Sequence, residues 1–189
     1  MRILVTGTTG GIGGAFAAVA QTAGHEVIAI NRADFADLAA ALAARRVQGL
    51  DAVVFATGTC PVTPITRLDD DAFTATLTVN CTYFLALMRE LVRTGAFAAR
   101  AQAVAVSSVS AREGWAGGAA YCASKGALSA LCRALDAELK PRGIAVTAIE
   151  PRYVRTRMFR EGAMRMGVRE DEAEAPEAFA LRILKGIES

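Results

Sequence analysis

The chain alternates short apolar runs with longer stretches whose apolar residues recur at helical spacing. The runs are rich in aliphatic and β-branched residues, so they predict buried strands at 2–6, 26–30, 51–56, 102–107 and 144–149, with a vestigial strand at 33–35. Helices are expected at 15–20, 36–46, 69–93 with a break near Leu77, 119–140, and from 175–177 to 187. This alternation predicts an α/β fold with a parallel, doubly wound sheet that binds ligands beyond the carboxyl ends of its strands.

Composition narrows the class of protein. With 189 residues and 53% hydrophobic content, the chain is expected to form one domain, residues 1–189, with both faces of the sheet covered. A formal charge of +2, carried by scattered basic residues, argues against a nucleic-acid partner. No apolar run approaches the roughly 20 residues that span a bilayer. Residues 1–6 already read as a strand, so we expect no signal peptide and no membrane partner.

The cysteines and the one histidine carry little chemistry. Cys60, Cys81, Cys122 and Cys132 lack paired metal spacing, so no metal site is expected. We interpret them as reduced, mostly buried thiols of a cytoplasmic protein. The histidine, His25, is expected at the surface.

A glycine-rich turn follows the first predicted strand. Gly7 would allow a tight turn, Gly11 the close approach of a phosphate, and Gly13 the packing of helix on strand. A strand, a glycine turn and a helix together place backbone N–H groups where a pyrophosphate can bind. The spacing T-G-x-x-x-G-x-G differs from the dinucleotide fingerprint G-x-G-x-x-G, and a merely flexible loop is the alternative.

Tyr121 and Lys125 lie four residues apart on a predicted helix, so their side chains share one face. The ordinary pKa of a tyrosine phenol is about 10. A neighbouring ammonium favours the phenolate and would lower that pKa by roughly 1 to 3 units. The pair is therefore a candidate general acid/base, although a surface tyrosine beside a solvated lysine gives the same spacing.

Together these motifs resemble the short-chain dehydrogenase/reductase family over nearly the whole chain. Thr6-Gly7-x-x-x-Gly11-Ile12-Gly13, Asn80, Ser108 and Tyr121-x-x-x-Lys125 occur in the family's order, with Ser108 thirteen residues before Tyr121. The resemblance implies a Rossmann-like sheet of about six strands in the order 3-2-1-4-5-6, with helices on both faces. It implies the catalytic residues Asn80, Ser108, Tyr121 and Lys125. It implies a cofactor site made of Gly7, Thr9, Gly11, Ile12, Gly13, Asn31, Arg32, Asp34, Ala56, Thr57, Gly58, Tyr121, Lys125, Pro151, Val154 and Thr156.

The family mechanism assigns a role to each catalytic residue. Tyr121 would exchange a proton with the substrate oxygen while a hydride moves between the nicotinamide and the substrate carbon. Ser108 would hydrogen-bond the same oxygen, although Ser107 or Ser110 could take its place. Lys125 would lower the pKa of Tyr121 and bind the ribose, and the backbone carbonyl of Asn80 would hold a water that connects Lys125 to solvent.

The end of the second strand decides the cofactor. A carboxylate there would bind the ribose 2′-OH of NAD, whereas an arginine accommodates the 2′-phosphate of NADP. The strand ends with Asn31 and Arg32, which favours NADP(H) over NAD(H). Asp34 could instead be the ribose carboxylate, although it more closely resembles the family's aspartate on the adenine side.

The chain departs from the family pattern in three places. Thr57-Gly58 replaces Asn-Ala-Gly, and Arg152 replaces the glycine of the Pro-Gly-x-Val-x-Thr segment. The third departure is that the family's last strand has no counterpart, so the sheet edge would be covered by the final helix, covered by a partner subunit, or left exposed.

A lid is expected at 157–172, where Met164 and Met166 either line a pocket or simply pack.

The expected function is that of an NADP(H)-dependent oxidoreductase acting on a small carbonyl or alcohol, either as a ketone or aldehyde reductase or as an alcohol dehydrogenase. A non-catalytic NADP-binding sensor or partner subunit is the alternative, and a nucleotide-sugar epimerase would need a larger substrate domain. The loop 111–118 would border the substrate, where Trp115 either stacks on a ring or covers the pocket, or simply packs, and Tyr153 would help to form the pocket. The stripe Ala123, Ala127, Ala130 and Ala134 suits a homodimer or homotetramer.

Overall fold

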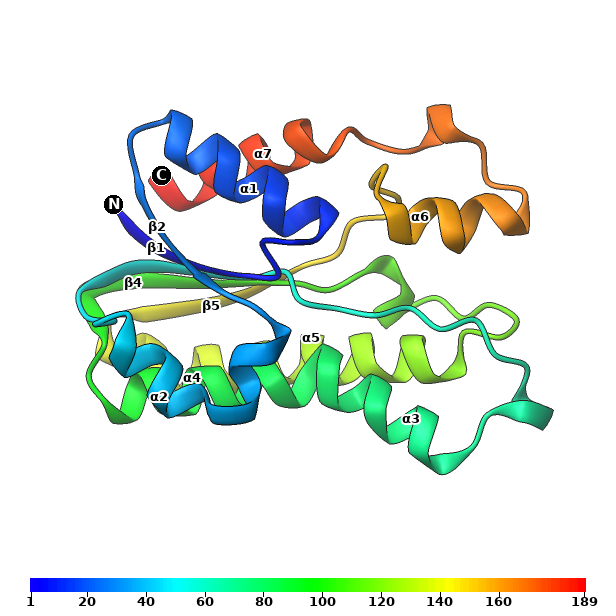
Figure 1. Ribbon diagram of the computed structural model, residues 1–189, viewed down its shortest axis with the longest axis horizontal. Coiled ribbons are helices and arrows are strands. Elements are labelled where there is room, and N and C mark those ends of the chain that lie inside the picture. Colours follow the sequence, from blue (N-terminus) through cyan, green and yellow to red (C-terminus); the bar gives the residue numbers. More distant parts are fainter.

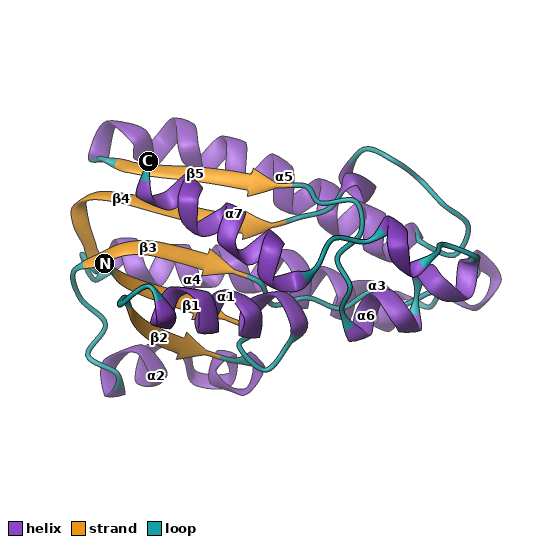
Figure 2. Ribbon diagram, turned by 90° about the horizontal axis from the view of Figure 1, so that it is seen from above, coloured by secondary structure: helices purple, strands orange, loops and turns teal.

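The computed structural model describes residues 1–164 and 167–189 and contains one parallel sheet (Figures 1 and 2). Its strands are β1 (Arg2–Thr6), β2 (Glu26–Ile30), β3 (Leu50–Phe55), β4 (Phe97–Val106) and β5 (Ile144–Ile149). They lie in the order β2-β1-β3-β4-β5, and every neighbouring pair is parallel. The α/β class and the order of the strongly predicted strands are confirmed.

Helices cover both faces of the sheet. Figure 1 shows α1 (Gly11–Thr22) and α7 (Pro176–Glu188) side by side above it. Below it lie α2 (Leu38–Ala44), α4 (Tyr83–Arg93) and α5 (Ala119–Leu139). The shorter α3 (Asp70–Leu77) and α6 (Arg157–Glu161) lie beyond the carboxyl ends of the strands. These ends therefore form the edge at which loops from different strands can meet.

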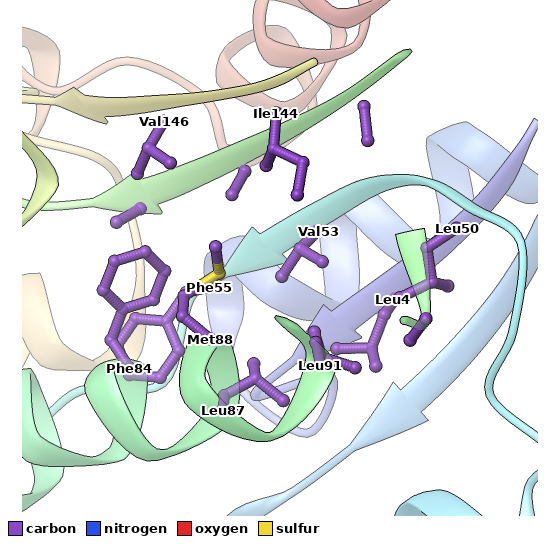
Figure 3. Close-up of a cluster of buried hydrophobic side chains, with 14 of the residues drawn as sticks. Leu4, Leu50, Val53, Phe55, Phe84, Leu87, Met88, Leu91, Ile144 and Val146 are labelled. Carbon is purple, nitrogen blue, oxygen red and sulfur yellow. The ribbon is translucent and has the colours of Figure 1, made fainter. Parts of the chain in front are cut away.

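Alternation of side chains along each strand produces two separate cores, since successive residues of a strand point to opposite faces. Leu4, Val53 and Phe55 face α4, whose Phe84 and Leu87 complete the cluster in Figure 3. On the opposite face, Ile3, Val5 and Val54 meet α1 and α7 through Phe16, Phe179 and Ile183. Burial on both sides explains why the strand sequences are apolar without alternation.

The prediction of a vestigial strand at 33–35 is wrong, and the sheet has five strands instead of about six. Arg32–Asp37 forms a 3₁₀ helix. The Asp34 carboxylate accepts the backbone N–H of Asn31 at 2.7 Å, and the Phe35 ring stacks on Tyr83 with centroids 4.2 Å apart. A local cap and an aromatic contact thus replace the ladder hydrogen bonds that a strand would need.

The other predicted helix and strand boundaries lie closer to those of the structure. The break expected near Leu77 is confirmed, because α3 ends at Leu77 and the π-helical turn Thr78–Thr82 separates it from α4. The helix predicted at 15–20 begins earlier, at Gly11, and β4 begins earlier than expected, at Phe97. Within the described ranges no further strand pairs with β5, and α7 packs over a face of the sheet instead.

Two further observations bear on the expectations for the chain as a whole. Among the helices that the structure describes, none has both the length and the apolar character needed to cross a membrane. His25 lies near the surface, where its Nε2 is 3.0 Å from Glu188 Oε1. This contact connects the beginning of β2 to the end of α7.

Candidate functional site

A cavity of about 390 Å³ lies where β3, β4 and β5 end. It is lined by predicted site residues from five parts of the chain: Ile12, Ala56, Gly58, Ser108, Tyr121, Lys125, Pro151, Val154 and Thr156. The fold therefore brings the predicted acid/base pair together with the residues expected around the nicotinamide.

The catalytic candidates come from the end of β4 and from α5. Ser108 follows β4 directly, and its hydroxyl accepts the Ser110 N–H at 3.1 Å, which shapes the turn. Tyr121 and Lys125 lie one helical turn apart on α5, and the Lys125 Nζ is 5.7 Å from the centroid of the Tyr121 ring. That Nζ donates to the Val106 carbonyl at 2.8 Å.

The electrostatics of the pair differ from the sequence-based expectation. Burial lowers the pKa of Lys125 to about 8, because an ammonium that is 5% exposed loses its hydration. Burial likewise raises the pKa of Tyr121, and hydrogen bonding with Ser108 opposes this only in part. The Tyr121 pKa is therefore shifted in the direction opposite to the sequence-based expectation, because burial of the phenol dominates.

Asn80 lies in the π-helical turn between α3 and α4 and is fully buried. Its Oδ1 accepts the Thr59 N–H at 2.8 Å, while its Nδ2 donates to Thr59 O at 2.9 Å and to Ser124 Oγ at 2.8 Å. The side chain thus joins the loop after β3 to the helix that carries Tyr121 and Lys125. A Cβ on Gly58 would sit 3.4 Å from Asn80 Oδ1 and 3.7 Å from Lys125 Nζ, so all three residues meet.

The glycine turn after β1 has the properties of a dinucleotide site. Gly7 adopts a φ of +71°, and a Cβ there would approach the backbone of Ala56 and Thr57 to 3.0 Å. A Cβ on Gly11 would lie 2.4 Å from Thr156 Cγ2. No side chain caps the N-terminus of α1, and its first turn carries no acid, which leaves N–H groups for an anion. The residues present therefore fit a pyrophosphate, with Thr9, Gly11 and Gly13 in or beside the turn.

The adenosine side is built by the end of β2. Thr8 Oγ1 donates to Asn31 Oδ1 at 3.1 Å, which holds Asn31 beside the glycine turn. Both Asp34 oxygens are engaged, one by the Asn31 N–H and the other by Arg45 Nη2 at 2.9 Å. Arg32 is exposed. These residues lie outside the cavity, which covers only the nicotinamide and substrate end.

Thr57 and Gly58 lie in the loop where the family pattern has Asn-Ala-Gly. The hydroxyl of Thr6 accepts the N–H groups of Ala56 and Thr57, at 3.1 and 3.2 Å, so the loop is still tied to β1. The Thr57 Oγ1 itself is buried, and no described residue is its partner. The loop keeps its backbone support but gains an unsatisfied hydroxyl.

Two loops at the mouth of the cavity are joined by ion pairs. Arg112 Nε is 2.7 Å from Glu150 Oε2, and Arg152 Nη2 is 2.8 Å from Glu113 Oε1. The Val109 N–H also donates to Pro151 O at 3.1 Å. Arg152 thus lines the cavity, although 60% of its side chain is exposed, and its charge is balanced by Glu113.

The substrate end includes residues that the sequence left open or did not single out. Trp115, Tyr153 and Met158 line the cavity, whereas Met164 is exposed and Met166 lies outside the described residues. Cys60, Val106 and Val109 also line the cavity, and they were not anticipated from the sequence. Their positions just after β3 and β4 could have indicated this role. In the part of the chain that the structure describes, no group of acidic, cysteine or histidine side chains could hold a metal.

Comparison with known proteins supports the same reading. A family profile described as short chain dehydrogenase matches residues 33–166. The L-xylulose reductase of Mesocricetus auratus is 30% identical over 84% of this chain and 74% of its own length. The 3-oxoacyl-acyl-carrier-protein reductase of Rickettsia felis is 27% identical over 82% of this chain and 73% of its own length.

Solved structures share the fold. An actinorhodin polyketide ketoreductase variant with NADPH superposes with a TM-score of 0.83 at 22% identity, covering 98% of this chain and 89% of its own. A 4-hydroxyisoleucine dehydrogenase with NADH has a TM-score of 0.81 at 23% identity, covering 96% and 88%. The profile match and the 30% identical relative agree with the shared fold. The chain therefore belongs to the short-chain dehydrogenase family of oxidoreductases, which act on carbonyl and alcohol groups.

Proposed function

We propose that the protein is an NADP(H)-dependent reductase of ketones or aldehydes that can run in reverse as an alcohol dehydrogenase. The observation that carries this proposal is the shared cavity. Ser108, Tyr121 and Lys125 line it together with Ile12, Val154 and Thr156, the residues expected around a nicotinamide. A carbonyl placed between the two hydroxyl groups would also face the cofactor side.

In this proposal Tyr121 is the acid/base. When bound, the reduced nicotinamide supplies a hydride to the carbonyl carbon and is left oxidised, and the carbonyl becomes an alcohol. Tyr121 gives its proton to the carbonyl oxygen. Because the pKa of Tyr121 is raised, this transfer requires a cation that stabilises the phenolate left behind. Lys125 provides that cation one helical turn away, and Ser108 donates to the same oxygen. Asn80 supports the site through its bonds to Thr59 and Ser124, and its carbonyl is proposed to hold a connecting water.

The charges at the end of β2 favour NADP(H). Asp34 has both oxygens occupied by Asn31 and Arg45, so binding a ribose 2′-OH would require it to give up a bond. Arg32 is exposed at the same corner, and no described side chain forms an ion pair with it. A 2′-phosphate would pair with that guanidinium without displacing another charge.

The proposal is tested by titrating the purified protein with NADPH and NADH while following nicotinamide fluorescence. We expect NADPH to bind more tightly than NADH, and Arg32→Ala to remove that preference. Arg100→Ala is the matched control, because Arg100 is also exposed but lies near the beginning of β4. Tighter binding of NADH would overturn the NADP preference, and binding of neither would leave the chain without the proposed activity.

A second variant tests the acid/base. Tyr121→Phe keeps the ring but removes the proton, so cofactor binding should persist while the rate of carbonyl reduction falls by about 100-fold or more. Undiminished reduction by this variant would exclude Tyr121 as the acid. Intact NADPH binding without reduction of any carbonyl by the wild type would instead support the non-catalytic sensor.

We also propose that the protein acts in the cytoplasm as a homodimer or homotetramer. Ala123, Ala130 and Ala134 are exposed along α5, and small residues allow a second helix to approach closely. Light scattering of the purified chain would test the assembly. The substitution Ala130→Arg should dissociate the oligomer.

A further inference from the structure

Beyond the reacting residues, three hydroxyl groups that line the cavity already take part in hydrogen bonds within the protein. The Ser110 hydroxyl accepts the indole N–H of Trp115 at 3.1 Å. The Thr156 hydroxyl accepts the Phe159 N–H at 3.3 Å, and the Ser107 hydroxyl is buried against Lys125 O and Ser129. The Ser107 hydroxyl is thus fully engaged, whereas the Ser110 and Thr156 hydroxyls are engaged only as acceptors.

The charged groups of the wall are likewise balanced. Glu113 and Arg152 pair with each other at 2.8 Å, and Lys125 lies beneath the Tyr121 ring, where the proposed function uses it. Cys60 remains a neutral thiol because burial raises its pKa to about 11. The phenol of Tyr153 completes the polar groups of the wall. Apart from Lys125, which the proposed function assigns to Tyr121, the charged side chains of the wall are paired with each other.

Trp115 presents a fixed apolar surface next to the acid/base. A Cβ on Gly118 would lie 2.5 Å from Trp115 Cε2, so the indole rests directly on the backbone of Gly118. Ser110 fixes the indole N–H, and the Trp115 ring centroid is 6.2 Å from that of Tyr121. The indole therefore has only its apolar surface left to offer to a ligand.

The chain after β5 supplies a second apolar wall. The Tyr153 and Phe159 rings contact each other with centroids 5.8 Å apart and planes tilted by 55°. Met158, Ala163 and Val168 line the same side of the cavity. At about 390 Å³ the cavity is near the lower end of ligand pockets, which span roughly 300–1,000 Å³, and the nicotinamide shares it.

We propose that the substrate is a compact, largely apolar ketone or aldehyde that carries a ring, with the ring against Trp115 and the carbonyl between Ser108 and Tyr121. The inference rests on the proposed function and specifies its substrate class. The hydride and the proton convert the ring compound's C=O into CH–OH, with the reduced cofactor as the only reductant. Polyhydroxylated and anionic carbonyls are disfavoured because their polar groups would lie against the apolar surfaces of Trp115 and Phe159, where they would lose hydration without gaining a partner.

A substrate panel with NADPH tests this class. We expect kcat/KM for acetophenone to exceed that for 4-acetylbenzoate, which adds a carboxylate to the same ring, by at least tenfold. The same margin is expected over L-xylulose. A preference for 4-acetylbenzoate or L-xylulose, with turnover intact, would overturn the substrate class and leave the reductase proposal standing. Failure to reduce even acetaldehyde would remove the reductase proposal itself, and this inference with it.

Variants at Trp115 separate contact with substrate from a structural role. Trp115→Ala should lower kcat/KM for acetophenone by at least tenfold but change that for acetaldehyde, which is too small to span the cavity, by less than threefold. Trp115→Phe keeps an aromatic surface and should retain most acetophenone activity. In the wild type, acetophenone should also quench the fluorescence of Trp115, the one tryptophan of the chain. Equal losses for both substrates in Trp115→Ala, or no quenching, would overturn the assignment.

Discussion

Replacing Lys125 by methionine is expected to abolish reduction while leaving the fold at least as stable as before. Lys125 is 5% exposed, and burial lowers its pKa from the ordinary value of 10.5 to about 8. At neutral pH the folded protein thus contains a cation that water would solvate better. Methionine has a similar shape without the charge, so it removes this cost.

The magnitude follows from the pKa. Because one pKa unit is about 1.4 kcal/mol, the difference between 10.5 and about 8 corresponds to roughly 3 kcal/mol of destabilisation at pH 7. The variant leaves the Val106 carbonyl without its donor, which costs about 1–3 kcal/mol. The net change at pH 7 is therefore expected to lie between about zero and 2 kcal/mol in favour of Lys125→Met.

The pH dependence is the sharper signature. The folded-state pKa of Lys125 lies below the unfolded-state value, so the unfolded chain binds more protons between about pH 8 and 10.5. The contribution of Lys125 to stability consequently rises with pH across that window. The advantage of Lys125→Met should shrink by about 2 kcal/mol from pH 7 to pH 10. Lys125 also lowers the pKa of the buried thiols of Cys60, Cys81 and Cys132, so its removal raises these values further and reduces the stability of the variant at high pH in the same direction.

Urea unfolding followed by Trp115 fluorescence at both pH values measures this difference. Lys185→Met is the matched control, because Lys185 is exposed on α7 and its replacement should not alter the pH dependence. Parallel stability–pH curves for the wild type and Lys125→Met would refute the reasoning, since they would mean that folding does not desolvate the ammonium.

Three further substitutions test individual features by urea unfolding. Arg46 adopts a left-handed φ of +50°, so Arg46→Gly should stabilise the fold by about 0.5–1 kcal/mol, and a lower midpoint would contradict the strain. Thr57→Val removes a buried hydroxyl without a described partner and should be neutral or stabilising by up to about 1 kcal/mol; a clear loss would reveal a hidden partner. Ser129 donates to Glu150 Oε1 at 2.7 Å, so Ser129→Ala should cost about 1–3 kcal/mol, and unchanged stability would show this bond to be dispensable.

The sequence predicted the framework because burial dominates it. The apolar runs became parallel strands, since a strand covered on both faces needs continuous aliphatic residues. The break after Leu77 was also predictable from the pattern around Asn80. The prediction of a strand at 33–35 was wrong because the conformation of this segment depends on the Asp34 cap and on the stacking of Phe35 against Tyr83, which is distant in the sequence.

The sequence predicted which residues form the site better than it predicted their pKa shifts and ion pairs. Spacing brought Ser108, Tyr121 and Lys125 to one cavity. The direction of the Tyr121 pKa shift depends on how much protein covers the phenol, which no spacing encodes. The pairing of Glu113 with Arg152 likewise arises only when loops from two strands meet.

The two ion pairs at the mouth of the cavity also define how its loops align. Each loop contributes one arginine and one glutamate to these pairs, since Arg112 meets Glu150 while Glu113 meets Arg152. Sliding one loop along the other would place Arg112 against Arg152 in one direction and Glu113 against Glu150 in the other, and either contact would be repulsive. Four surface charges that add little to stability individually can therefore select a single alignment of Trp115 relative to the chain after β5.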